Sequence, residues 1–348
     1  MKKLKFPLLL ISFFFFSEAF SYDNIKKDKK TIINSIESQK DRLIEISDNI
    51  WEAAEPALLE FKSSKYLSDY AEENGFRVTR GVAEIPTAFV AEFGSGKPVI
   101  GILGEFDANP GISQKKQPTK EPLVKGAAGH GCGHNLYGTG SLGAAIAIKE
   151  MIESGEISGT IRFYGTPAEE TIFAKVWMVR AGLFDDVDVC MDWHPSDEVE
   201  AATQSSKALV DFRLRFFGDA SHASGDPWNG NSAVDAMELY TTGLNYYREH
   251  VRPTARIHYD IEKAGDVVNV VPDFAQIWTR LRENDKENVN ILYERAKKIA
   301  EAASMMANVD YEMELISGIY EIIPNRFGAG IIQKNIESLG EIKYTEDE

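Results

Sequence analysis

Apolar side chains recur three or four positions apart along the first part of the chain, which is the spacing of one face of an α-helix. Residues 32–51 keep this spacing and predict a long amphipathic helix that ends at Pro56. A second helix is predicted over residues 64–73, because the following Asn74 and Gly75 can take the left-handed conformation that commonly stops a helix.

Short runs of β-branched and apolar residues, bounded by glycine or proline, follow these helices and are typical of strands. The predicted strands are residues 87–93, 98–106, 160–165 and 187–193. A helix is predicted over residues 141–153, between the second and third strands. Because strand, loop and helix alternate, we expect an α/β fold with a mixed sheet and functional loops at the strand ends.

From Lys207 the order changes to strand, helix, strand, strand, helix, strand. The strands are expected at residues 208–216, 256–262, 275–283 and 310–316, and the helices at residues 231–249 and 289–306. This βαββαβ order is that of a ferredoxin-like unit. Since helical character resumes after Pro324, residues 207–320 are expected to be a domain inserted into a first domain made of residues 22–206 and 321–348.

Residues 1–21 have the three parts of a secretory signal peptide, namely a positive start, an apolar middle and a small-x-small end. We expect cleavage near Ser21 and a periplasmic or secreted mature protein. The apolar run is short for a bilayer, and no later stretch is long and uncharged enough to form a membrane span. An uncleaved membrane anchor is the alternative.

The net charge of the chain indicates which kinds of molecule it can bind. The 348 residues carry a formal net charge of −16, and no basic face gathers along the chain. Binding to nucleic acid requires such a face, so a nucleic-acid partner is excluded. The acidity is typical of a soluble globular protein.

A cluster of metal-ligating side chains lies between the first domain's second and third strands. His130, Cys132 and His134 fall within five residues and are separated by glycines, which let the backbone turn tightly enough to direct several ligands to one point. This spacing predicts a metal site. The alternative for Cys132 is a disulfide with Cys190, since these are the only two cysteines and the expected compartment is oxidising.

Further acidic and imidazole groups follow the predicted strands. Glu105 and Asp107 close the second strand, Glu169 and Glu170 follow the third, and His194 follows the fourth. Ends of strands in one sheet meet at an edge, so these groups are expected to lie near the cluster. The alternative for the glutamate pair is a helix N-terminus, where carboxylates favour the helix dipole.

Together these residues resemble the co-catalytic metallo-amidohydrolases of the aminoacylase and carboxypeptidase type. In that family a zinc-peptidase-like catalytic domain, a mixed sheet with helices on both faces, carries an inserted dimerisation lid. The run Gly-Cys-Gly-His-Asn-Leu-Tyr-Gly-Thr-Gly at residues 131–140 is most similar to the p-aminobenzoyl-glutamate hydrolase branch. The hippurate and N-acyl-amino-acid hydrolases usually have Asp after Cys-Gly-His.

The resemblance implies a role for each matching residue. The implied metal ligands are Cys132, His134, Glu170 and His194, and the implied general base is Glu169. Two further matching residues, which the resemblance implies contact the substrate, lie in the inserted domain. There His222 matches a lid histidine that reaches the substrate carbonyl, and Asn269 matches a lid residue that holds the substrate. The alternatives are a loop histidine before a helix for His222 and a turn residue before Pro272 for Asn269.

The resemblance also implies the reaction and its partners. These are the hydrolysis of N-acyl or N-aroyl amino acids such as p-aminobenzoyl-glutamate, two divalent ions (Mn²⁺ or Zn²⁺) per subunit, and a homodimer formed through the lid. The family supplies a final His ligand beyond the point where this chain stops, and here the last histidine is His258. The chain is therefore expected to be either a fragment or a truncated, catalytically incompetent remnant that binds a ligand or partner without turnover.

Overall fold

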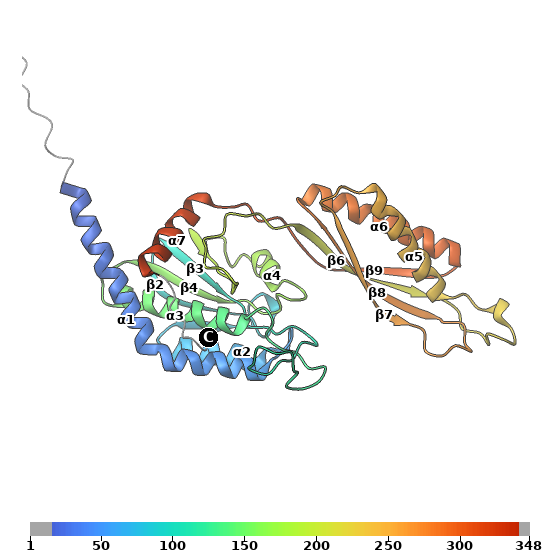
Figure 1. The fold of residues 1–348 in the computed structure, drawn as a ribbon, viewed down its shortest axis with the longest axis horizontal. Helices are drawn as coiled ribbons and strands as arrows, with labels where there is room; N and C mark the ends of the chain where they lie inside the picture. The colour runs from blue at the N-terminus through green and yellow to red at the C-terminus, as the bar shows by residue number, and fades with distance from the viewer. Residues whose placement is uncertain (1–15, 341–348) are drawn as a thin grey trace, which may run out of the picture. The chain divides into compact units, whose positions relative to one another are not determined.

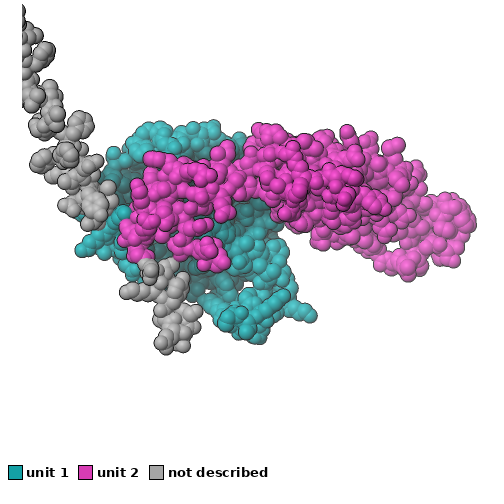
Figure 2. Space-filling view, turned by 45° about the horizontal axis from the view of Figure 1, so that its top comes forward, with its two compact units in different colours: residues 1–195 teal, residues 196–348 magenta. Residues whose placement is uncertain are grey.

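The computed structural model describes the backbone of residues 16–340 and the side chains of residues 27–340. The chain divides into two compact units, Met1–Pro195 and Ser196–Glu348 (Figure 2). Of the predicted signal peptide, residues 1–15 lie outside the described residues, and only the backbone is described for residues 16–21. Among the helices within residues 16–340, none combines the length and the apolar character that a bilayer crossing needs.

The first unit is built on a five-stranded sheet of spatial order β1-β2-β4-β3-β5 (Figure 1). β4, β3 and β5 run parallel, whereas β1 and β2 pair antiparallel at the other edge. The strands are β1 (Arg77–Arg80), β2 (Phe89–Ser95), β3 (Val99–Gly104), β4 (Gly159–Gly165) and β5 (Val189–Met191). The helices are α1 (Phe16–Ala53), α2 (Phe61–Glu73), α3 (His134–Glu153) and α4 (Ala174–Arg180), with a 3-10 turn at Val82–Glu84.

Two neighbouring side chains of β4 show which face of the sheet each helix covers. Phe163 lies in a buried cluster with Ile46 of α1 and Leu142 of α3. Tyr164 lies in a separate cluster with Met178 of α4. Because successive side chains of a strand point to opposite faces, α4 covers the face opposite to α1 and α3. The predicted α/β fold with helices on both faces of a mixed sheet is confirmed.

The predicted elements of this unit are all present, and most ends differ by a few residues, but α3 begins at His134, seven residues before the predicted start. The helix predicted over residues 32–51 is the C-terminal part of α1. β1 and α4 are not predicted, because β1 has the sequence Arg-Val-Thr-Arg with a single apolar residue, and the seven residues of α4 are too few for a helical period to stand out.

The second unit holds a four-stranded antiparallel sheet of spatial order β7-β8-β6-β9. Every second side chain of β8 is buried, so one face of the sheet forms a core, which packs against α5 and α6 (Figure 1). The strands are β6 (Ala208–Phe217), β7 (Arg256–Ala264), β8 (Phe274–Glu283) and β9 (Asp310–Ile319). The helices are α5 (Ala233–Tyr247), α6 (Lys286–Ala307) and α7 (Arg326–Leu339), with 3-10 turns at Pro227–Asn229 and Arg248–His250.

Along the chain, the second unit has its elements in the order β6, α5, β7, β8, α6, β9, as the pattern predicts. α5 starts after Ser232, whose hydroxyl accepts a hydrogen bond from the Asp235 amide. α6 starts after Asp285, whose carboxylate accepts one from the Asn288 amide. Such side-chain caps satisfy amides that lack a partner inside the helix. The role of this unit as a dimerisation lid and the return of residues 321–348 to the first domain stay predictions.

Candidate metal centre

The carboxyl ends of the parallel strands gather the candidate groups of the first unit. Glu105 follows β3, Glu169 and Glu170 follow β4, and His194 follows β5. The loop after β3 leads to α3, whose first residue is His134. Since parallel strands end at the same edge of a sheet, groups from four distant segments meet there.

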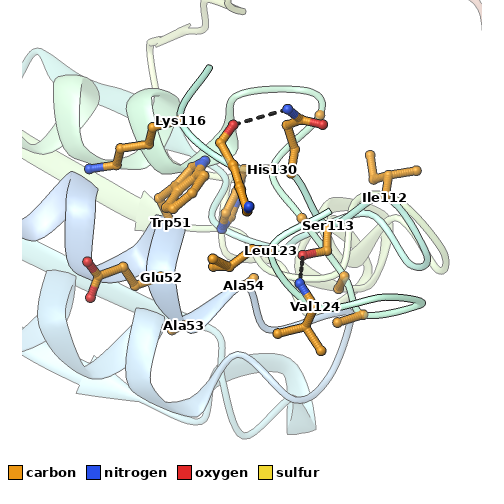
Figure 3. A pocket seen from close by; sticks show the side chains of 16 residues that line it. Trp51, Glu52, Ala53, Ala54, Ile112, Ser113, Lys116, Leu123, Val124 and His130 are labelled. Atoms are coloured by element: carbon orange, nitrogen blue, oxygen red, sulfur yellow. Dashed lines mark hydrogen bonds between the residues drawn. The ribbon is translucent and has the colours of Figure 1, made fainter. Parts of the chain in front are cut away.

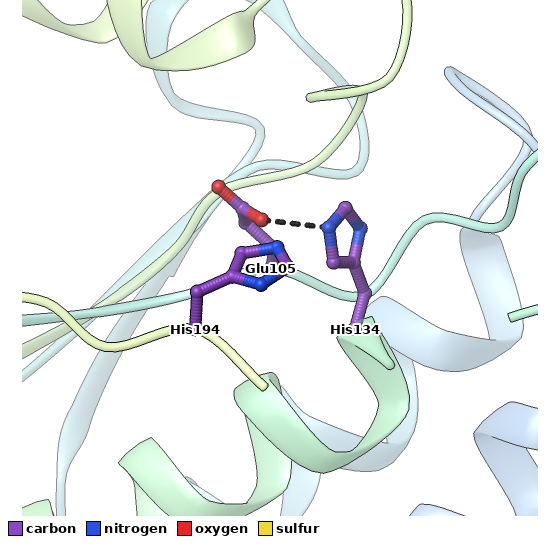
Figure 4. Close-up of side chains that lie close together, drawn as sticks. All are labelled: Glu105, His134 and His194. Carbon is purple, nitrogen blue, oxygen red and sulfur yellow. Dashed lines mark ion pairs between the residues drawn. The ribbon is translucent and has the colours of Figure 1, made fainter. Parts of the chain in front are cut away.

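Two sets of ligand-type side chains are close enough to hold a cation. One set is Cys132, His134 and Glu170, and the other is Glu105, His134 and His194 (Figure 4). Within each set the ligand atoms lie within 4.8 Å of one another. The structure therefore brings the four predicted ligands to one edge, with His134 common to both sets, and adds Glu105.

His134 is oriented by Asp107. The ring Nδ1 lies 2.9 Å from Asp107 Oδ1 and 3.0 Å from the Asp107 carbonyl oxygen. This leaves Nε2 facing the ligand atoms, 2.9 Å from Glu105 Oε2 and 3.9 Å from Glu170 Oε1. A carboxylate that accepts the second ring N–H is the usual support of a metal-binding histidine. Burial acts to lower the pKa of His134, but the Asp107 hydrogen bond and the Glu105 charge raise the pKa to about 10.

Three buried atoms at this place lack a hydrogen bond of good geometry with any described residue, although two of them, Glu105 Oε2 and His134 Nε2, lie 2.9 Å apart as an ion pair. They are Glu105 Oε2, His134 Nε2 and Glu170 Oε1. Buried polar atoms without a hydrogen bond are costly, by about 1–3 kcal/mol each, and are rare in native proteins. A divalent cation in either set would bind His134 Nε2 and a carboxylate oxygen of Glu105 or Glu170, and the mixture of carboxylate, imidazole and thiol suits Zn²⁺ or Mn²⁺. The residues present therefore fit the divalent metal that the resemblance implies.

Asn109 holds the loop that carries Cys132. Its Oδ1 accepts hydrogen bonds from the amides of Gly131 and Cys132, each at 3.2 Å, and its amide nitrogen lies 3.7 Å from Cys132 Sγ. Gly133 then turns the chain into α3 with φ +73°, a conformation that favours glycine. Gly133 thus serves the tight turn that the sequence predicts.

Cys132 and Cys190 are both free thiols, so the disulfide considered as an alternative is absent. Burial, assisted by the nearby Glu170 carboxylate, raises the pKa of the Cys132 thiol to about 11. A thiol in such surroundings becomes a thiolate when a cation binds beside it.

Glu169 belongs to neither set of ligand atoms. Burial, with a contribution from the Glu105 charge, raises the pKa of Glu169 to about 7. The helix N-terminus considered as an alternative is not where this pair lies, because α4 begins only at Ala174. Glu169 is therefore a carboxylate beside the ligand set but outside it.

Sequence reasoning misses Glu60, which supports the segment that carries Glu169. The Glu60 side chain is fully buried, and its carboxylate accepts hydrogen bonds from the Ala168 amide at 2.9 Å and the Thr87 hydroxyl at 3.1 Å. Ala168 has a left-handed φ of +55°, which L-residues rarely adopt, so this bond helps to hold an unfavourable turn. No local pattern marks a contact between residues this far apart in sequence.

Glu60 makes the stability of the chain depend on pH. Burial raises the pKa of Glu60 from 4.5 to about 7. Between these values the folded chain holds a proton that the unfolded chain releases, so the free energy of unfolding falls as the pH rises. Relative to wild type, a Glu60→Gln variant is expected to gain about 3 kcal/mol of stability between pH 4.5 and about pH 7.5.

Urea unfolding at several pH values measures this difference. Glu156→Gln, at an exposed glutamate, is the control and is expected to follow wild type across the range. A difference between Glu60→Gln and wild type that does not change with pH contradicts the prediction.

Lys175 is a second residue that the sequence pattern leaves out. It lies in the short helix α4 and forms an ion pair with Glu105 Oε1, on the carboxylate oxygen that does not face His134. Burial acts to raise the pKa of Glu105, but His134 and Lys175 outweigh it and lower the pKa. His134 and Lys175 together thus favour the ionised form of Glu105.

The two candidate residues of the second unit lie on adjacent segments of it. His222 forms a backbone bridge with Val270, and the Ala223 amide donates a hydrogen bond to the Asn269 carbonyl at 3.1 Å. The His222 and Asn269 side chains are exposed. The His222 Nδ1 accepts hydrogen bonds from two backbone amides, at 2.9 and 3.2 Å, so the hydrogen of the neutral ring lies on Nε2.

Residues 101–339 match the family model described as peptidase family M20/M25/M40. The chain is 40% identical to one of the subunits of the p-aminobenzoyl-glutamate hydrolase of Escherichia coli K12 over 321 residues, which cover 91% of this chain and 66% of that relative. It is 30% identical to mouse Xaa-Arg dipeptidase over 333 residues, which cover 92% of this chain and 73% of that relative. The chain thus spans just under two thirds of the length of the E. coli relative.

Solved structures share the fold. An aminobenzoyl-glutamate utilization protein of Klebsiella pneumoniae aligns with a TM-score of 0.68 and 18% identity over 86% of this chain and 81% of that one. A Bacillus subtilis protein described as a dinuclear metal-binding peptidase of the M20 family aligns with a TM-score of 0.59 and 20% identity over 87% of this chain and 81% of that one.

Proposed function

Because this chain belongs to peptidase family M20/M25/M40, we propose that it hydrolyses the amide bond of N-acyl or N-aroyl amino acids, and p-aminobenzoyl-glutamate most of all. The observation that carries the proposal is the presence, beside Glu169, of two sets of ligand-type side chains that share the buried His134. The 40% identity to part of a p-aminobenzoyl-glutamate hydrolase supports the choice of substrate.

The metal is proposed to occupy the two sets that share His134, with Cys132, Glu170 and His194 as the other predicted ligands and Glu105 as a candidate. Divalent ions bound there would supply Lewis acidity and lower the pKa of a water molecule toward neutrality. The metal-binding peptidase of B. subtilis and the chemistry of the ligand set support divalent ions, with Zn²⁺ or Mn²⁺ as the proposed metal.

Glu169 is proposed as the general base. In hydrolysis the C–N bond breaks, the acyl carbon gains the hydroxyl of water, and the remaining proton goes to the departing amine. Glu169 is suited to carry that proton, because its pKa of about 7 allows it both to accept and to release a proton near neutral pH. His222 is proposed to donate its Nε2 hydrogen to the oxyanion, and Asn269 is proposed to hold the substrate.

Assembly and location are proposed on separate grounds. The relatives include two different subunits of one E. coli hydrolase, so a partner of the second unit is proposed to be either another copy of this chain or a related protein. Residues 1–21 support the proposal that the protein is exported.

The proposal is tested by incubating the purified chain with p-aminobenzoyl-glutamate after loading with Zn²⁺ or Mn²⁺. We expect equal amounts of p-aminobenzoate and glutamate to appear and the release to stop when a chelator removes the metal. Elemental analysis of the same sample gives the number of bound ions. A fully loaded chain that hydrolyses neither aroyl-glutamates nor acyl-glutamates contradicts the proposal and favours the incompetent remnant.

A further inference from the structure

A pocket of about 360 Å³ lies between the end of α1 and the loop that leads to the metal motif. Its lining includes Trp51 of α1 and four side chains of the loop, Ile112, Lys116, Val124 and His130. Trp51 and Lys116 lie on one side of it, and Ile112 and Val124 lie on the other (Figure 3).

The wall of the pocket is tied both to the helix and to the metal motif. His130 Nε2 lies 3.1 Å from the Ile50 carbonyl oxygen at the end of α1. Asn109 and Gly129 exchange two backbone hydrogen bonds, and the Asn109 side chain holds the amides of Gly131 and Cys132. Gly131 lines the pocket, and the next residue along the chain is the candidate ligand Cys132. A residue that lines the pocket is therefore the direct sequence neighbour of a candidate ligand.

The side chains around the pocket are apolar, although they are exposed. Ile112, Leu123 and Val124 are 46%, 53% and 59% exposed, in a loop that is otherwise polar. Exposed apolar groups gathered around a hollow commonly mark a place where a ligand binds.

The two lysines at the pocket are paired, and Glu52 adds a carboxylate to the lining. Lys116 forms an ion pair with Asp48 at 3.0 Å and places its Nζ 5.3 Å from the centre of the Trp51 ring, and Lys115 pairs with Glu121. Between these charged groups the pocket offers a ligand the aromatic and aliphatic surface of Trp51, Ile112 and Val124. A cavity of about 150 Å³ admits benzene, so this one has room for a substituted ring.

We propose that this pocket binds the aromatic ring of the substrate's acyl group and so selects aroyl over small acyl amides. The proposal rests on the proposed function, since it names the part of the substrate that the pocket recognises. The ring would lie against Trp51, Ile112 and Val124, with the carbonyl carbon directed toward Cys132 and the ligand set.

The first test measures binding of 4-aminobenzamide, a neutral probe that carries the aromatic ring and the amide, to the full chain by ligand-observed NMR titration. Val124→Asp and Trp51→Ala are each expected to weaken binding of the probe by about fivefold or more. Val124→Asp removes an apolar contact, and Trp51→Ala removes an aromatic one. Val179→Asp is the matched control, since Val179 of α4 is 58% exposed and does not line the pocket. It is expected to bind the probe as wild type does.

The second test compares kcat/KM for p-aminobenzoyl-glutamate with kcat/KM for acetyl-glutamate. The ratio is expected to fall about fivefold in Val124→Asp and to stay at the wild-type value in Val179→Asp. Failure of wild type to turn over either substrate is a failure of the proposed function, and the probe titration then still decides whether the pocket binds a ring. Equal probe affinity in wild type, Val124→Asp and Trp51→Ala overturns the pocket proposal, even where turnover is observed.

Discussion

A Glu169→Gln variant is expected to lose turnover of p-aminobenzoyl-glutamate by about 10²–10⁴-fold while keeping its metal. Glutamine has nearly the shape of glutamate but cannot accept the proton of the attacking water. Metal binding is expected to persist, because Glu169 is in neither set of ligand atoms. Steady-state kinetics and elemental analysis on the same preparation measure both quantities.

Glu156→Gln is the matched control, because Glu156 is exposed and follows the C-terminal end of α3. It is expected to keep the kinetics and the metal content of wild type. Near-normal turnover by Glu169→Gln shows that another group takes the proton. Loss of metal from Glu169→Gln shows instead that Glu169 is a ligand, and this also contradicts the assignment.

His134→Ala is expected to abolish stoichiometric metal binding, because His134 is the one residue that both candidate sets share. Its removal also leaves the buried Glu105 and Asp107 carboxylates without their imidazole partner. Removing one partner of a buried ion pair costs about 3–5 kcal/mol, so the metal-free variant is also expected to unfold more easily. Elemental analysis after removal of excess metal and thermal unfolding measure the two effects.

His194→Ala separates loss of metal from loss of fold. His194 is exposed and belongs only to the set with Glu105, so this variant is expected to fold and to keep the metal held by Cys132, His134 and Glu170. His250→Ala, at an exposed histidine of the second unit, is the control and should match wild type. Full metal content in His134→Ala contradicts the shared-ligand assignment.

The candidate metal ligands could be predicted from the sequence for a physical reason. Parallel strands of an α/β sheet end at the same edge, so Glu170 and His194, each placed just after a predicted strand, had to lie near each other. The glycines around Cys132 and His134 are a local signal of equal strength, since a tight turn that aims two side chains at one point requires them.

The roles of Glu60 and Lys175 and the presence of the pocket could not be predicted from the sequence. Glu60 meets Ala168 across 108 positions of the chain, and Lys175 meets Glu105 across 70. α4, which carries Lys175, is one of the short elements whose periodicity is too brief to recognise. Contacts of this kind depend on how separate segments pack, and a single sequence carries no record of that packing.

The sequence by itself determined the order of helices and strands, the α/β class of the first unit and the residue types that gather at the strand ends. These properties depend on periodicity and on neighbours a few residues apart. Only the tertiary structure decided that Asp107 turns the His134 Nε2 toward the ligand atoms, that Glu105 joins them, and that Trp51 faces the loop before Cys132 across a pocket. Side-chain direction at a site is set by hydrogen bonds and packing between segments far apart in the chain, and these form only when the chain folds.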